Sequence, residues 1–236
     1  IILGNCKMKI AILTPSRERA YHLKKFIDSV IHNQSFNNHI SFYNYIDQDD
    51  PTRERYSTIL RPGHTIYNII GKPQSVSKSW NILAQKAYTD KVDILIMGND
   101  DLTYTTKNWD TLLENEIKKF SDQIYCMWFE DKRQGSKHCA FPIVSKKWYE
   151  TLGYLTPGIF HFFYNDTWIF DIAKRINRTH FIPNIITPHV HLVNDKTYNR
   201  NRKTSQGHLA NLDQVIFKNT EGERIKAAEK LMKVMQ

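Results

Sequence analysis

The first half of the chain alternates short apolar runs with longer stretches in which apolar residues recur at helical spacing. Short apolar runs bounded by turn residues are typical of buried strands, and periodic stretches are typical of helices packed on one face. Because neighbouring parallel strands need a crossover, usually a helix, the alternation predicts an α/β domain with a mostly parallel central sheet flanked by helices. The expected strands span residues 9–14, 40–46, 65–70 and 93–97, with helices over 19–33, from Ser77 onward and over 109–120.

The second half of the chain is less regular. Strands are expected over 124–129 and 139–144, a helix opens at Asn165 or Asp166, and a closing helix covers 225–235. A chain of 236 residues with 41% apolar composition is long enough to bury one sizeable core. We therefore expect one domain over 1–205, with a C-terminal helical extension over 206–236 packed on it.

Composition limits the partners and the compartment. The formal net charge of +9 favours polyanionic partners, although a solvated basic surface explains it equally well. The three cysteines, Cys6, Cys126 and Cys139, lack the close spacing of a disulfide framework or a thiolate zinc site. No apolar stretch approaches the roughly 20 residues that span a bilayer, and no leader pattern opens the chain. A soluble, cytoplasmic protein is expected.

Polar residues cluster where the expected parallel strands end. The segment DILIMGNDDL, residues 93–102, runs from a buried strand into the adjacent carboxylates Asp100 and Asp101. Such carboxylates repel each other unless a cation lies beside them, and a divalent metal bound to a diphosphate would supply it. The alternative is a turn in which Asn99 and Asp100 bond their own backbone. Residues 14–17 and Asp47 end other strands, so all of these should converge on one crevice.

Several segments, taken in order, resemble the metal-dependent GT-A glycosyltransferases, particularly the family-2-like group. DILIMGNDDL is similar to the Asp-x-Asp region of that family, and KIAILTPSRERAYHLKKFIDSV, residues 9–30, to its opening strand and helix. Further similar segments are GKPQSVSKSWNILAQKA (71–87), FFYNDTWIFDIA (162–173) and PHVH (188–191). The resemblance covers roughly residues 9–195 and implies a GT-A, Rossmann-like fold.

The resemblance also implies a role for individual residues. The donor would be a nucleotide-diphosphate sugar, most simply a UDP-sugar, and the cofactor Mn²⁺ or Mg²⁺. Asp166 would be the catalytic base, which implies inversion at the anomeric carbon. The nucleotide-sugar contacts would be Thr14, Pro15, Ser16, Arg17, Asp47, Lys78, Asn81 and Asp100, and the metal ligands Asp101 and His191.

Three of these assignments have competing interpretations. Asn99 stands where the metal motif usually begins with Asp, which leaves Asp101 as the direct ligand and Asp100 for the ribose or a second metal. Asp166 could instead only cap the helix that it opens. His189 and His191 point the same way in an extended segment, so either could reach a metal, and we favour His191.

The acceptor stays open. It is either a glycan, lipid-linked sugar or protein, or the hydroxymethylated bases of DNA, as for some phage-encoded sugar transferases, in which case the protein would act in a host cytoplasm. Basic residues of two loops, 132–137 and 196–203, could hold such an anion. One alternative function is a sugar-nucleotide nucleotidyltransferase, although that class usually opens with a Gly-rich loop rather than TPSRER. Another is a nucleic-acid-binding module without catalysis. The oligomeric state is not predicted.

Overall fold

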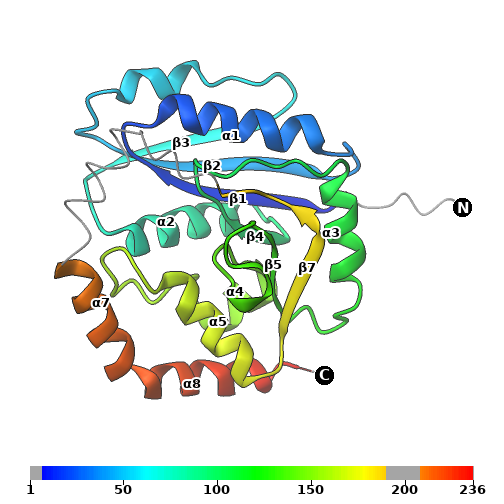
Figure 1. Cartoon of the computed structure of the whole chain (residues 1–236), viewed down its shortest axis with the longest axis vertical. Helices are drawn as coiled ribbons and strands as arrows, with labels where there is room; N and C mark the ends of the chain where they lie inside the picture. Colours follow the sequence, from blue (N-terminus) through cyan, green and yellow to red (C-terminus); the bar gives the residue numbers. More distant parts are fainter. Residues whose placement is uncertain (1–6, 190–207, 236) are drawn as a thin grey trace, which may run out of the picture.

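A seven-stranded, mostly parallel sheet with helices on both faces organises the molecule (Figure 1). The structure is a computed structural model that describes residues 7–189 and 208–235. The strands lie in the order β3-β2-β1-β4-β6-β5-β7. Their bounds are β1 (Lys9–Ser16), β2 (His39–Asp47), β3 (Thr65–Gly71), β4 (Ile94–Met97), β5 (Cys126–Glu130), β6 (Ile143–Ser145) and β7 (Thr179–Ile186).

The parallel half of the sheet follows the predicted pattern. Strand β1 pairs in parallel with β2 and β4, and β2 with β3. Helices α1 (Ala20–Asn33) and α2 (Val76–Thr89) supply two of the crossovers, and α3 (Trp109–Ile117) follows β4. The predicted α/β architecture is therefore confirmed, and the carboxyl ends of β1, β2 and β4 meet at one edge of the sheet.

Each face of the sheet carries its own core. Because side chains alternate along a strand, Ile10 and Ile12 of β1 face one side, while Ala11 and Leu13 face the other. The first side packs against α1 and α3. The second packs against α2, α4 (Lys146–Leu152) and α5 (Asn165–Arg175). Because helices cover both faces of the sheet, the side chains of β1 are apolar on both faces. Its sequence is therefore a continuous apolar run rather than an alternation of apolar and polar residues.

The second half departs from the sequence-based expectation in its details. Strand β6 is antiparallel to both β4 and β5, whereas β5 and β7 are parallel. The short helix α4 was not predicted; Ser145 caps its start by accepting the N–H of Trp148, and Gly153 ends it with a positive φ. Two short 3₁₀ helices, over Arg53–Thr58 and Gly135–Lys137, lie in loops.

Two helices, not one, form the C-terminal extension. In Figure 1, helix α7 (His208–Asn219) lies to the left of α5 and helix α8 (Glu221–Met232) lies below it. Ala227, Ala228 and Leu231 of α8 are buried in the same core as α2, α4 and α5. Arg224 is 3% exposed, donates to Asp171 of α5 at 2.8 Å and lies over the Phe217 ring. The extension thus shares the core of the main domain.

The structure also describes two of the cysteines and the helices that were considered as possible membrane spans. Cys126 and Cys139 are buried free thiols with their sulfur atoms 3.6 Å apart. None of the helices that the structure describes is long and apolar enough to cross a membrane.

Candidate active site

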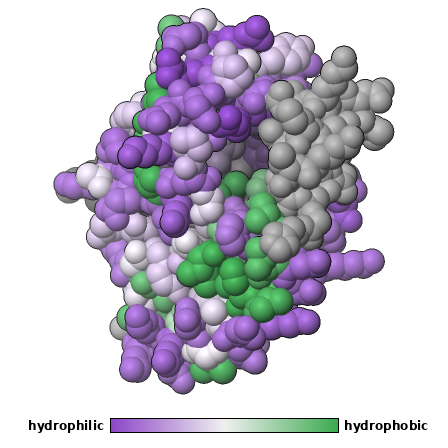
Figure 2. All heavy atoms as spheres, turned by 90° about the vertical axis from the view of Figure 1, so that its left-hand side faces the viewer, coloured by the Kyte–Doolittle hydropathy of each residue, from purple (hydrophilic) through white to green (hydrophobic). Residues whose placement is uncertain are grey.

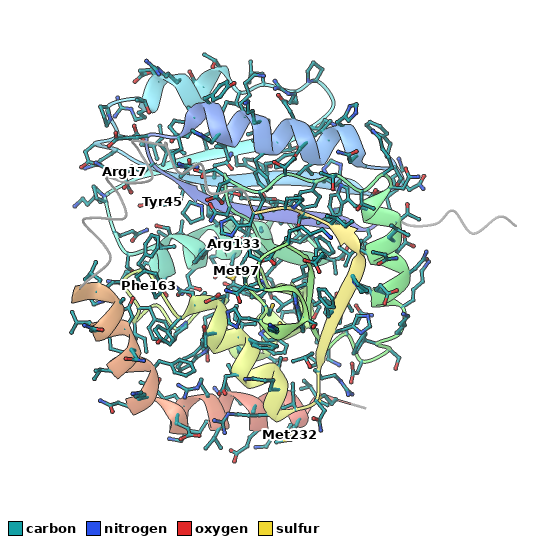
Figure 3. All side chains as sticks on the ribbon, in the orientation of Figure 1. Arg17, Tyr45, Met97, Arg133, Phe163 and Met232 are labelled. Atoms are coloured by element: carbon teal, nitrogen blue, oxygen red, sulfur yellow. The ribbon has the colours of Figure 1, made fainter. Side chains whose placement is uncertain are left out.

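A cleft of about 500 Å³ opens at the carboxyl ends of β1, β2 and β4. Figure 2 shows a hollow on the face that looks left in Figure 1, with hydrophobic surface below it. In Figure 3, the labelled Arg17 and Tyr45 lie on the upper side of this region and Phe163 on the lower. The structure brings six of the predicted site residues to the cleft wall: Pro15, Ser16, Arg17, Asp47, Asp100 and Asp101.

The strand ends approach each other closely because β4 is followed by glycine. A Cβ atom on Gly98 would lie 2.8 Å from the Thr14 Oγ1 and 2.9 Å from a methyl carbon of Ile12, both in β1. Thr14, predicted as a nucleotide contact, is 1% exposed and lies next to Gly98 rather than on the cleft wall. The sequence Gly-Asn-Asp-Asp therefore brings the two carboxylates alongside β1.

Asp100 is held from two sides by β1 and the residue before α1. The Arg19 Nε donates to Asp100 Oδ1 at 2.6 Å, and the Ser16 hydroxyl donates to Oδ2 at 2.7 Å. Asp100 is 5% exposed, and burial raises its pKa to about 6 despite the opposing effect of Arg19. Much of the hydrogen-bonding capacity of this carboxylate is already used within the protein.

Arg17 forms the second charged contact between strand ends. Its guanidinium donates to Asp47 at 2.8 Å and to Asp49 at 2.5 Å, and these carboxylates raise its pKa. Burial raises the pKa of Asp47 above its ordinary value, against the effect of Arg17. Arg17 and Asp47 thus lie together at the end of the cleft formed by β1 and β2.

Asp101 faces a histidine. Its Oδ1 lies 3.1 Å from the His189 Nε2, and the two side chains are 7% and 13% exposed. The main chain holds this arrangement through a bridge between Leu102 and His189 and through the His189 N–H, which donates to the Asp131 carbonyl. The favoured metal ligand, His191, lies outside the described residues, as does the basic segment 196–203. His189 is therefore the histidine that the structure brings to Asp101.

Asp101 and His189 can hold a divalent metal. A carboxylate oxygen is an ordinary ligand of Mn²⁺ and Mg²⁺, and an imidazole nitrogen is a ligand of transition metals such as Mn²⁺; both ions keep other positions for water and for diphosphate oxygens. Among residues 7–189 and 208–235, no group of three or more side chains is arranged as a complete metal site. Within the described residues, Asp101 and His189 are therefore a pair of candidate ligands.

Lys78 and Asn81 of α2 do not line the cleft. Lys78 is exposed. The Asn81 amide donates to the Thr156 carbonyl at 2.7 Å and accepts the N–H groups of Leu155 and Thr156. Asn81 thus fixes the loop after α4.

Asp166 lies in the first turn of α5, beside a second cavity of about 450 Å³. Its Oδ2 is 2.9 Å from the His138 Nε2, and its Oδ1 accepts the N–H of Thr167. The two cavities adjoin: Phe162 and Leu209 line the first, while their chain neighbours Phe163 and Ala210 line the second. Asp166 is 29% exposed, so its carboxylate is reachable.

A further histidine–carboxylate pair lies on the wall of the main cleft. The His161 Nδ1 is 2.9 Å from Asp213 Oδ1, and Asp213 comes from α7. The same carboxylate accepts the N–H groups of His161, Phe162 and Phe163, each at 2.9 Å. The C-terminal extension therefore fixes the loop that forms one side of the cleft.

Sequence reasoning missed Arg19, His138 and Asp213. Arg19 stands in TPSRER beside the predicted Arg17, so its position after a strand end was an available signal. His138 is 28 residues from Asp166, and Asp213 is 52 from His161. A local sequence pattern does not indicate contacts between residues that are so far apart along the chain.

The similarity of this chain to known proteins lies in its structure rather than in its sequence. No model of a protein family matches the chain, and no curated protein matches it significantly. Residues 1–349 of TarS from S. aureus, also solved with UDP-GlcNAc, superpose with a TM-score of 0.55 at 11% identity. That match covers 76% of this chain and 59% of the TarS fragment. A mannosyltransferase from Pyrobaculum calidifontis, in complex with GDP-Man and Mn²⁺, gives 0.56 at 10% identity, covering 98% and 74%.

The chain has the GT-A fold. A cytidylyltransferase from Leptospira borgpetersenii also matches, with a TM-score of 0.52 at 14% identity, over 90% of this chain and 95% of that one. The fold is thus common to sugar transferases and to an enzyme of another transferase class, and at these identities it does not separate their activities.

Proposed function

We propose that this protein is a metal-dependent glycosyltransferase that moves a sugar from a nucleotide-diphosphate sugar, most simply a UDP-sugar, to an acceptor hydroxyl. The observation that carries the proposal is the contact between Asp101 and His189 at the edge of a 500 Å³ cleft. Ligand sites of open α/β sheets lie beyond the carboxyl ends of the strands, where this cleft is. Its volume is in the range of ordinary small-molecule sites.

The metal has a defined place in the proposal. Asp101 and His189, with His191 as a further candidate, would hold Mn²⁺ or Mg²⁺. The bound ion would supply positive charge to the diphosphate leaving group. Asp47 and Arg17 would orient the nucleoside at the other end of the cleft, and Pro15 and Ser16 would contact it. Thr14 would act from behind the cleft wall by shaping the end of β1, and Asn81 by fixing the loop after α4, whereas the exposed Lys78 of α2 would contact the donor only from outside the cleft as it stands.

Asp166 would be the base of the transfer. Its carboxylate would take the proton of the acceptor hydroxyl as that oxygen attacks the anomeric carbon, which gives inversion. Its position supports this role, because it lines the cavity next to the donor cleft. His138 would hold the carboxylate in place through the 2.9 Å contact. The second cavity would then be the acceptor side of the site.

The proposed acceptor is an anion. A net charge of +9 supports an anionic acceptor such as DNA with hydroxymethylated bases or an acidic glycan. A family-2-like relationship and a phage or viral origin agree with such an acceptor and are part of the proposal.

A nucleotidyltransferase that makes sugar nucleotides is the second candidate. The likeness to a cytidylyltransferase over most of both chains favours it. The two activities release different products from different substrates. A glycosyltransferase releases a nucleoside diphosphate from a nucleotide sugar, whereas a nucleotidyltransferase releases pyrophosphate from a nucleoside triphosphate.

The test is a product assay on the full chain. UDP-, GDP- and CDP-sugars are incubated with Mn²⁺ and with either hydroxymethylcytosine-containing DNA or an acidic oligosaccharide. The proposal expects release of the nucleoside diphosphate together with a gain of one sugar mass on an acceptor. Pyrophosphate release from CTP and a sugar phosphate, without sugar transfer, would favour the second candidate. Salt-sensitive DNA binding without either reaction would indicate a binding module.

A further inference from the structure

His161 is held in one orientation by a buried carboxylate. The Asp213 side chain is fully buried, whereas that of His161 is 47% exposed and lines the cleft. An ionised carboxylate only accepts hydrogen bonds, so the Nδ1 of His161 carries the hydrogen in their 2.9 Å contact. The other ring nitrogen, Nε2, is then the one available to a ligand in the cleft. Carboxylate–histidine pairs fix the tautomer and the orientation of the ring in this way.

The cations already on the cleft wall are largely neutralised. Arg17 is paired with Asp47 and Asp49, and Arg19 is paired with Asp100. These guanidinium groups therefore offer an incoming diphosphate little uncompensated charge. A carboxylate such as Asp101 would repel the diphosphate without a cation between them.

His161 lies next to the N-terminal end of helix α2, which is a second source of positive potential in the cleft. Its carbonyl accepts the N–H of Val76, the first residue of α2, and Val76 and Ser75 line the same cleft. The N-terminal end of a helix carries a partial positive charge and favours anions. The Asp213 carboxylate accepts four hydrogen bonds from the 161–163 loop, and these bonds lower its pKa.

We propose that His161 binds the diphosphate of the donor through Nε2 and that Asp213 of α7 is its positioning residue. The inference rests on the proposed function and deepens it, because it assigns the C-terminal helices a part in donor binding. With a hydrogen on each ring nitrogen, the imidazole would donate from Nδ1 to Asp213 and from Nε2 to a phosphate oxygen. The substrate class is a nucleoside diphosphate or its sugar ester.

The test compares diphosphates with the matching nucleosides. Dissociation constants are measured by NMR titration with the diamagnetic ion Mg²⁺ for UDP, GDP and CDP, and for uridine, guanosine and cytidine. A hydrogen bond to a charged group is worth enough to change affinity about tenfold or more. His161→Gln should raise the dissociation constant of the preferred diphosphate by that factor and leave the dissociation constant of its nucleoside unchanged. His180→Gln is the matched control, because His180 also contacts a carboxylate, Glu116, but does not line the cleft.

A measurement on the unmutated protein keeps the inference testable if the variant folds poorly. Long-range ¹H–¹⁵N spectra should show His161 with Nδ1 protonated before ligand is added, and a shift of its Nε2 signal on adding the diphosphate. Asp213→Asn should abolish the fixed tautomer of His161. It should also weaken diphosphate binding, as His161→Gln does.

Two negative results are distinguishable. If the wild-type protein binds a diphosphate and its Nε2 signal and the His161→Gln affinity are both unaffected, only the inference is overturned. If the wild-type protein binds no nucleoside diphosphate at all, the proposed function fails and the inference fails with it.

Discussion

Adjacent carboxylates at the end of β4 have different surroundings. Asp100 is bonded by Arg19 and Ser16, whereas Asp101 faces His189. The sequence predicted that a cation must lie beside this pair, and for Asp100 that cation is an arginine of the protein itself. Which carboxylate receives the arginine depends on how the ends of the neighbouring strands β1 and β4 lie against each other, and no spacing along the chain indicates that. Asp101 is left as the carboxylate that faces His189, the other proposed metal ligand.

Removing Arg19 should destabilise the fold. Arg19 and Asp100 are 8% and 5% exposed, and breaking a buried ion pair from one side costs about 3–5 kcal/mol. We expect Arg19→Met to lower the free energy of unfolding by about that amount in urea titrations. The double variant Arg19→Met/Asp100→Asn should recover part of the loss, because no uncompensated charge is left. A loss in the double variant equal to the sum of the losses in Arg19→Met and Asp100→Asn alone would show that the pair is not coupled.

Replacing Asp166 should separate binding from transfer. Asp166→Asn keeps the shape of the side chain and removes the base, so nucleotide affinity should stay unchanged while the transfer rate falls about 10²- to 10⁴-fold. Steady-state kinetics and nucleotide titration check the two quantities. Asp28→Asn serves as the control, because Asp28 pairs with Lys24 and Arg61 away from the cleft. Wild-type transfer by Asp166→Asn would rule out this residue as the base.

At the scale of elements, the site is a set of loops that follow strands. The strands β1, β2 and β4 were predictable because their apolar runs end in Pro15, Asp47 and Gly98, and parallel strands end at one edge. The antiparallel β6 and helix α4 were not predictable, because a three-residue strand leaves no periodicity. The cleft wall from 158 to 163 is irregular, and its shape depends on Asp213 from another element.

Gly98 should be required for the junction of β1 and β4. A Cβ there would lie under 3.0 Å from Thr14 and Ile12, so Gly98→Ala must move a packed strand. Overpacking of this kind costs about 1–3 kcal/mol. It should also weaken nucleotide binding, because Asp101 follows three residues later. Gly222→Ala in α8 is the control: no atom lies within 4 Å of the added carbon, and alanine favours a helix. Equal thermal unfolding of the two variants would contradict this account.

At the scale of the whole molecule, the C-terminal helices close the fold on the side of the cleft. Helix α8 joins α5 through Arg224 and Asp171, and α7 joins the cleft loop through Asp213. The sequence predicted an extension over 206–236 that packs on the domain, but not that two helices form it or that one reaches the site. Partners such as His161 and Asp213 are separated by 52 residues, so only the tertiary structure relates them.

The Asp213 contacts should make the docking of α7 sensitive to acid. The pKa of Asp213 is lowered by the N–H groups that it accepts, so its ionised form is favoured in the folded state. Its contribution is complete above the ordinary carboxyl pKa of about 4 and is lost as pH falls through the lower folded value. Asp213→Asn should therefore lower unfolding free energy at pH 7 by about 1–3 kcal/mol, with a smaller difference near pH 3. A difference independent of pH would contradict this assignment.

Metal-dependent nucleotide binding tests the central claim most directly. Isothermal titration calorimetry with UDP, GDP and CDP, in Mn²⁺ and then in EDTA, is run on the wild-type protein and on Asp101→Asn, with Asp28→Asn as the control. Losing an outer partner of a metal ligand costs about 10- to 100-fold in affinity, so losing the ligand itself should cost at least that. The account predicts that one nucleotide binds only with metal and that Asp101→Asn removes this dependence. Binding that is equal in EDTA, or unchanged in Asp101→Asn, would contradict it.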